Sequence, residues 1–79
     1  MDTTGRHPGT AQAVRGFAYD HLPDHLRPVS VLFHDVAADL LGVLPDDPEL
    51  TACLRKLREA KDCAVLLAAL SYKEAEGRS

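Results

Sequence analysis

The chain has 79 residues, of which 46% are hydrophobic and 27% are charged, and its formal net charge is −3 with histidine neutral. This length allows one small domain, and domains of this size are commonly stabilised by disulfides, metals or self-association. The acidic balance argues against a protein whose main task is to grip DNA. No apolar run approaches the ~20 residues of a membrane span, and no apolar signal segment follows the first Met. We therefore expect a soluble protein of a reducing cytoplasm, without a membrane partner.

The cysteines and histidines do not form a recognisable metal or disulfide pattern. Cys53 and Cys63 lie ten residues apart on one expected helix, so they cannot face each other in an intrachain bridge. The histidine spacing fits no zinc site, and we expect no metal. We also expect no cofactor and no enzymatic activity, because the chain has no glycine-rich phosphate loop and no nucleophile–base arrangement. Self-association remains as the source of additional stability.

The N-terminal part divides into an arm and a lead-in. Residues 1–16 are small and polar without hydrophobic periodicity, which predicts a flexible arm. A helical domain is expected over residues 17–74, followed by a flexible tail at 75–79. Its first residues include two aromatics and Pro23, which disfavours helix at the preceding residue. This lead-in is therefore expected to be ordered but not helical.

The first helix is predicted over about residues 28–41. Pro28 suits a first helical turn, and Gly42 suits the end of a helix. Apolar residues recur between them at helical spacing. They are Val29, Leu32, Phe33, Val36, Ala37, Leu40 and Leu41.

The second helix is predicted to start with Asp47 as its cap and Pro48 in its first turn. No helix breaker follows before Gly77, so the helix is expected to continue to about residue 74. It is about twice as long as the first, and a short turn joins the two. The sequence therefore predicts an all-α fold, an antiparallel helical hairpin with an N-terminal arm.

Residues 63–70 (CAVLLAAL) carry no charge. The shorter first helix cannot cover every face of this segment, and a helix that is apolar all round is normally buried. We therefore expect a homo-oligomer in which this segment packs against its copies. In the alternative hypothesis, the chain is a small helical interaction module that binds a host protein through the apolar face of residues 63–70.

Two groups of side chains are candidates for ligand binding. The second helix carries a charge cluster with Arg55, Arg58 and Lys61, which is either a solvated face with i,i+4 pairs or the rim of an oligomer that binds phosphates. Phe17 and Tyr19 either pack on the helices or stack on a flat ring. Tyr19 is the better stacking candidate because its hydroxyl requires a polar neighbour.

The segment DHLPDHLRPVSVLFHDVAADLLGVLPDDPELTACLRKLREAKDCAVLLAAL resembles small phage proteins that sequester cyclic nucleotides. These anti-CBASS and anti-Thoeris sponges share a hairpin domain, with an "HLP…VS..F.D.A" first half and an "LP..PELT..LRKL.EAKD" second half. The resemblance covers about residues 17–70, and ELTACLRKLREAKD is its most specific part. Related sequences often carry an arginine soon after EAKD, where this chain has Val65, Leu66 and Leu67.

The resemblance implies a non-catalytic sponge in the cytoplasm of a bacterial host. Such proteins form homo-oligomers, commonly hexamers. They bind cyclic di- or trinucleotides or cyclic ADP-ribose isomers without cleaving them, and so block immune signalling. The resemblance places an aromatic residue against a base and basic residues against phosphates. The implied ligand-binding residues are Phe17, Tyr19, Ser30, Arg55, Arg58 and Lys61.

Overall fold

The computed structural model describes residues 1–77, and all regular structure within them is helical. The elements are α1 (Pro8–Val14), the 3-10 turn η1 (Arg15–Phe17), α2 (Arg27–Val43) and α3 (Pro48–Gly77). The all-α prediction is confirmed. Residues 78 and 79, the last two of the predicted tail, lie outside the described residues.

Helix α1 lies within residues 1–16, where the sequence predicts an arm without regular structure. It begins at Pro8, and the His7 side chain caps it by accepting the Gly9 N–H at 2.9 Å. A helix of seven residues is too short to be stable alone. It packs against α3, and this tertiary contact compensates for the weak local sequence signal.

Helix α2 begins one residue before its predicted start and ends two residues after its predicted end. Gly42 does not stop the helix, because it lies inside α2 and does not have the positive φ of a C-terminal glycine. The helix ends where Leu44 becomes extended, with φ −116° and ψ 141°. Pro45 follows, and the residue before a proline is driven out of helical geometry.

Helix α3 starts where the sequence predicts. Pro48 is its first residue, and the Asp47 carboxylate accepts the Glu49 N–H at 2.9 Å, which confirms the predicted cap. The helix continues through residues 75–77, which were assigned to the tail. The carboxylate of the neighbouring Asp46 binds the N-terminal segment.

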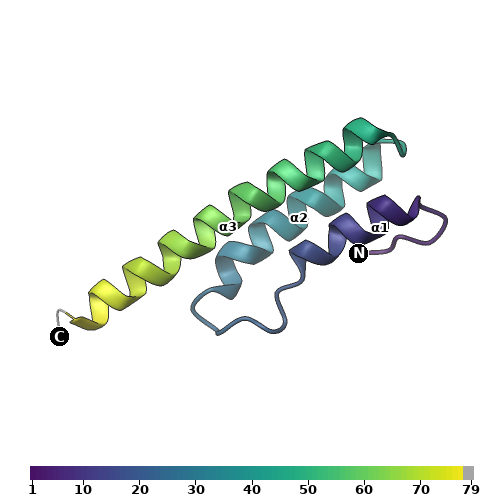
Figure 1. Cartoon of the computed structure of the whole chain (residues 1–79). Helices are drawn as coiled ribbons and strands as arrows, with labels where there is room; N and C mark the ends of the chain where they lie inside the picture. The colour runs from purple at the N-terminus through teal and green to yellow at the C-terminus, as the bar shows by residue number, and fades with distance from the viewer. Residues whose placement is uncertain (78–79) are drawn as a thin grey trace.

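Helices α2 and α3 lie side by side, and a short turn joins them at one end of the molecule (Figure 1). α3 has 30 residues and α2 has 17, so the lengths are about 45 Å and 25 Å at ~1.5 Å per residue. The C-terminal part of α3 therefore extends beyond the start of α2, which Figure 1 shows. The molecule is accordingly elongated, with dimensions of 50 × 20 × 18 Å.

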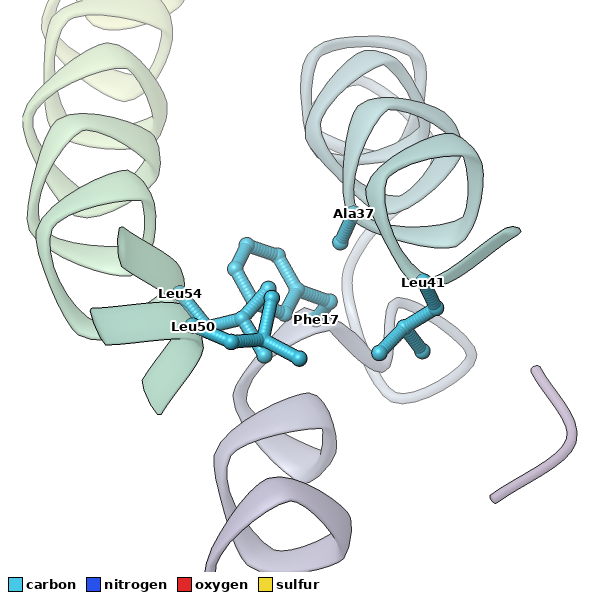
Figure 2. Packing of buried hydrophobic residues seen from close by; sticks show 5 residues of the cluster. All are labelled: Phe17, Ala37, Leu41, Leu50 and Leu54. Atoms are coloured by element: carbon cyan, nitrogen blue, oxygen red, sulfur yellow. The ribbon is translucent and has the colours of Figure 1, made fainter. Parts of the chain in front are cut away.

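The core lies where α1 and η1 meet the two longer helices. Phe17, which is fully buried, points between Leu50 and Leu54 of α3 and Ala37 and Leu41 of α2 (Figure 2). A buried phenylalanine contributes more apolar area than its aliphatic neighbours. The segment expected to be an arm and lead-in therefore supplies the central core residue.

Part of the first helix's predicted apolar pattern faces solvent rather than the core. Leu32 and Val36 are exposed, and so is Val43 at the end of α2. They recur at helical spacing on the outer side of α2, so the pattern correctly predicts a helix but overestimates its buried face.

Candidate ligand-binding site

The residues expected to bind a ligand do not converge on one place. Phe17 and Ser30 are both 0% exposed, so neither side chain is available at the surface of the chain. Phe17 has the packing role that the sequence left open for it. The Ser30 Oγ is buried without a hydrogen-bond partner among the described residues. A buried unpaired hydroxyl costs about 1–3 kcal/mol, so Ser30 is a weak point of the fold.

Arg58 and Lys61 meet at Gly16, in the turn that leads to Phe17. The Lys61 Nζ donates to the Gly16 carbonyl at 2.5 Å and lies 3.4 Å from an Asp62 carboxylate oxygen. Arg58 lies directly over Gly16, because a Cβ added there would stand 2.4 Å from the Arg58 Cδ. The two side chains therefore hold η1 against α3, and a side chain in place of Gly16 would have to displace Arg58.

The charge cluster on α3 does not pair as the spacing suggests. Within residues 1–77, neither Arg55 with Glu59 nor Arg58 with Asp62 forms an ion pair within 4.0 Å. Arg55 instead lines a pocket of about 560 Å³ between α1 and the start of α3. The other lining residues are His7, Gly9, Thr10, Asp46, Asp47, Pro48, Thr51 and Ala52.

Tyr19 lines a second, more open pocket of about 410 Å³. Its ring meets that of His34 on α2 edge-on, with centroids 5.2 Å apart and an interplanar angle of 87°. The sequence suggests only a surface or boundary role for His34. The remaining lining residues are Met1, Thr3, Ala11, Val14, Arg15, Ala18 and Asp20.

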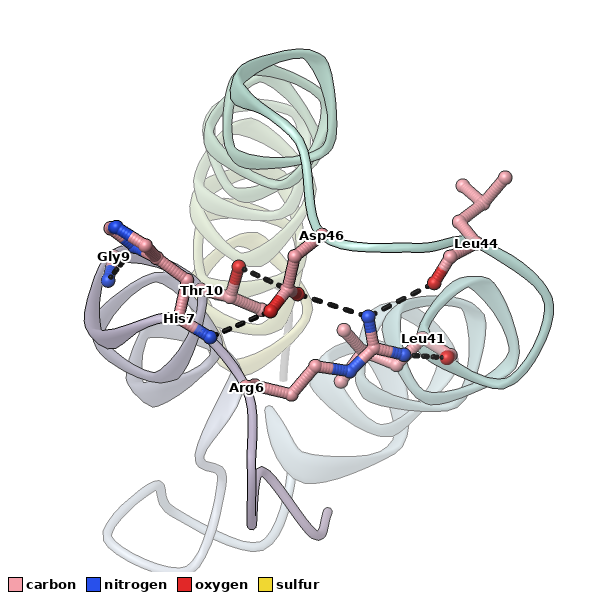
Figure 3. A network of polar contacts seen from close by, with 7 residues as sticks. All are labelled: Arg6, His7, Gly9, Thr10, Leu41, Leu44 and Asp46. Atoms are coloured by element: carbon pink, nitrogen blue, oxygen red, sulfur yellow. Dashed lines mark hydrogen bonds and ion pairs between the residues drawn. The ribbon is translucent and has the colours of Figure 1, made fainter.

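A polar network around Asp46 attaches the N-terminal segment to the turn between α2 and α3 (Figure 3). The Asp46 carboxylate accepts the His7 N–H at 2.7 Å and pairs with the Arg6 guanidinium at 3.0 Å. The Thr10 hydroxyl also donates to it, at 3.3 Å. The His7 N–H bond and then the Arg6 contact hold the pKa of Asp46 below its usual value.

Arg6 also completes the end of α2. Its guanidinium donates to the carbonyl of Leu44 at 3.0 Å and to that of Leu41, as Figure 3 shows. The last carbonyls of a helix have no partner within the helix, and a cation is favourable there. The sequence gives one hint of this network, the His7–Pro8 pair that starts α1. The contacts with Asp46 are invisible in the sequence because they span about 40 positions.

Exposed apolar side chains gather on the C-terminal half of α3. Leu66, Leu67 and Leu70 are 59%, 65% and 52% exposed, and they recur at helical spacing. Cys63 precedes them at the same spacing and is exposed, although its apolar neighbours in the sequence suggest a buried, inert thiol. These four side chains therefore form an apolar surface on α3 that the rest of residues 1–77 leaves uncovered.

The described residues contain no group of three or more histidine, cysteine or acidic side chains arranged to hold a metal ion. None of the helices in that part of the chain combines the length and hydropathy of a membrane span. Comparisons with protein-family models, with curated proteins and with solved structures found no match.

Proposed function

We propose that this chain is a phage sponge that sequesters cyclic oligonucleotide signals without cleaving them. The observation that carries the proposal is the open pocket at Tyr19, where an aromatic ring stands among polar and charged side chains. An aromatic side chain stacks on any nucleobase, with about 1–3 kcal/mol per base. The resemblance of residues 17–70 to cyclic-nucleotide sponges supports the same ligand class.

In this proposal α2 and α3 form the family's helical hairpin and assemble into a homo-oligomer, with a hexamer as the expected form. Leu66, Leu67 and Leu70 provide the contact between copies, because exposed apolar residues at helical spacing favour burial against another helix. The same surface would receive a host protein under the alternative function. A stable monomer at micromolar concentration would favour that alternative.

The basic residues of α3 have different roles in the proposed assembly. Arg55 and Arg58 are exposed and carry guanidinium groups suited to phosphates. Lys61 is only 12% exposed and is held by the Gly16 carbonyl, so its role is to fix the turn before Tyr19. Tyr19 is the stacking residue in place of Phe17, which is buried.

A sponge lowers a signal only if it outnumbers the signal and binds it more tightly than the receptor does. That requires nanomolar affinity, about −12 kcal/mol. A cyclic ligand is suited to this because its ring closure has already removed conformational freedom that a linear dinucleotide loses on binding. Linear dinucleotides are therefore expected to bind far more weakly than cyclic ones.

Calorimetry with cyclic di- and trinucleotides and cyclic ADP-ribose isomers tests the proposal, with linear dinucleotides as controls. We expect one cyclic ligand to bind with nanomolar affinity and to be recovered chemically intact after the protein is denatured. Tyr19→Leu should weaken binding at least about tenfold, the loss of one base stack. Tyr72→Leu is the matched control, because Tyr72 stacks on His25 near the far end of α3. No binding of any cyclic ligand, or recovery of a cleaved product, would contradict the proposal.

A further inference from the structure

Arg15 is a cation at the Tyr19 pocket whose guanidinium has no polar partner among the described residues. It is the first residue of η1, its side chain is exposed, and it lines the same pocket as Tyr19. Within residues 1–77 its guanidinium forms no hydrogen bond and no ion pair. The sequence does not single out Arg15, because it lies in the segment expected to be an arm. In the structure it lines this pocket together with His34 and Met1.

Two of the cations that the sequence favours, Arg58 and Lys61, lie against another side of the same turn. Lys61 donates to the Gly16 carbonyl, and the Arg58 side chain packs over Gly16. Both act on η1 from α3, and neither lines the Tyr19 pocket. Arg15 adjoins the same glycine but lines this pocket instead. Arg58 and Lys61 therefore contact the turn, whereas Arg15 lines the pocket at Tyr19.

The aromatic geometry leaves the pocket suited to a planar ring. Tyr19 and His34 meet at 87°, so their faces do not cover each other. The other ring pair, His25 and Tyr72, has centroids 3.9 Å apart and planes within 18°, so each covers a face of its partner. Asp20 also lines the Tyr19 pocket and offers a carboxylate acceptor to a ring amino group.

We propose that Arg15, Tyr19 and His34 form a nucleotide subsite in which Tyr19 or His34 stacks on the base and Arg15 binds the phosphate. This inference rests on the proposed function. Within each subunit, it assigns to Arg15 the contact with the phosphate of the bound nucleotide. Arg55 and Arg58, which do not line this pocket, would then contact phosphates elsewhere in the assembly. An unpaired guanidinium offers bidentate donors to phosphate oxygens, which an exposed lysine does not.

NMR titration of the full ¹⁵N-labelled chain with AMP, adenosine and inorganic phosphate tests the subsite. AMP is expected to shift the Arg15, Tyr19 and His34 signals at millimolar concentration, and adenosine and phosphate to shift them less. Arg15→Gln should weaken AMP binding about tenfold, the loss of a charge-assisted contact. Lys73→Gln is the control, because Lys73 is an exposed cation of α3 that lines neither pocket, and it should change AMP binding less than about twofold.

The outcomes separate this inference from the sponge proposal. AMP binding at Arg15 without tight binding of any cyclic nucleotide would support the subsite and reject the sponge. The subsite is wrong if AMP causes no shifts, or if the shifts centre on Arg55 and His7 in the other pocket. It is also wrong if Lys73→Gln weakens AMP binding as much as Arg15→Gln does. Unchanged dispersion of the remaining amide signals verifies that each variant is folded.

Discussion

At the scale of single residues, Phe17 contributes both to the stability of the chain and to the position of its candidate site. It is fully buried in the core, while Tyr19, two positions later, lines an open pocket. Gly16, on its other side, receives Arg58 and Lys61 from α3. Displacement of Phe17 would therefore release both the core and the turn that places Tyr19.

Phe17→Ala is expected to reduce the free energy of unfolding by about 3–5 kcal/mol, the cost of removing a large core side chain. Phe33→Ala is the matched control, because Phe33 packs against the same core but is only partly buried. Urea unfolding followed by circular dichroism measures both. An equal loss in the two variants would show that Phe17 is not the central core residue.

Ser30→Ala is expected to stabilise the chain, by up to about 1–3 kcal/mol, because it removes a buried hydroxyl that has no partner. The same denaturation experiment measures this change. The substitution should leave nucleotide affinity unchanged, since Ser30 is not accessible. A variant that loses stability, or that binds a cyclic nucleotide more weakly, would show that the hydroxyl has a partner in the assembled protein.

At the scale of elements, attachment of α1 depends on Asp46. Its pKa is lowered in the folded chain, so the interaction stabilises fully above the unfolded value of about 3.9 and is lost as pH falls through the folded pKa. We expect α1 amides to exchange faster with solvent below pH 4. Asp46→Asn should remove this pH dependence, whereas Asp39→Asn, at an exposed position on α2, should retain it. Hydrogen exchange followed by NMR gives the comparison, and an unchanged pH profile in Asp46→Asn would contradict the account.

Two glycines should respond to alanine with opposite sign. Gly42 lies inside α2 with open space where a Cβ would stand, so Gly42→Ala is expected to raise stability by about 0.5–1 kcal/mol. Gly5 has φ +78°, where an alanine is strained by about 1–2 kcal/mol. Thermal unfolding of the two variants compares them directly. Destabilisation by Gly42→Ala would mean that this position needs a left-handed conformation.

The sequence predicts α2 and α3 because proline in the first turn and apolar periodicity are local signals. Pro8 gives the same start signal for α1, but seven residues with Gly9 among them show no periodicity. What fixes α1 is its packing against α3 together with the contacts to Asp46, about 40 positions away. The candidate site likewise depends on contacts between residues that lie far apart in the sequence. The charges of Arg58 and Lys61 are visible in the sequence, but their contact with Gly16, 45 positions from Lys61, is not.

At the scale of the whole molecule, the length of α3 leads to the proposed assembly. Leu67→Glu is expected to dissociate the oligomer, because a charge in an apolar contact is unfavourable. Leu32→Glu is the matched control, since Leu32 on α2 has the same 65% exposure but lies outside residues 63–70. Light scattering at micromolar concentration measures the mass of each. Dissociation by Leu32→Glu alone would place the contact on α2.

Native mass spectrometry of the full chain, with and without the cyclic nucleotide panel, tests the central claim most directly. The account predicts an oligomer, with a hexamer expected, that gains whole ligand masses and releases each ligand unaltered. It also predicts no comparable gain from linear dinucleotides. A monomer whose mass is unchanged by every cyclic nucleotide would contradict the claim.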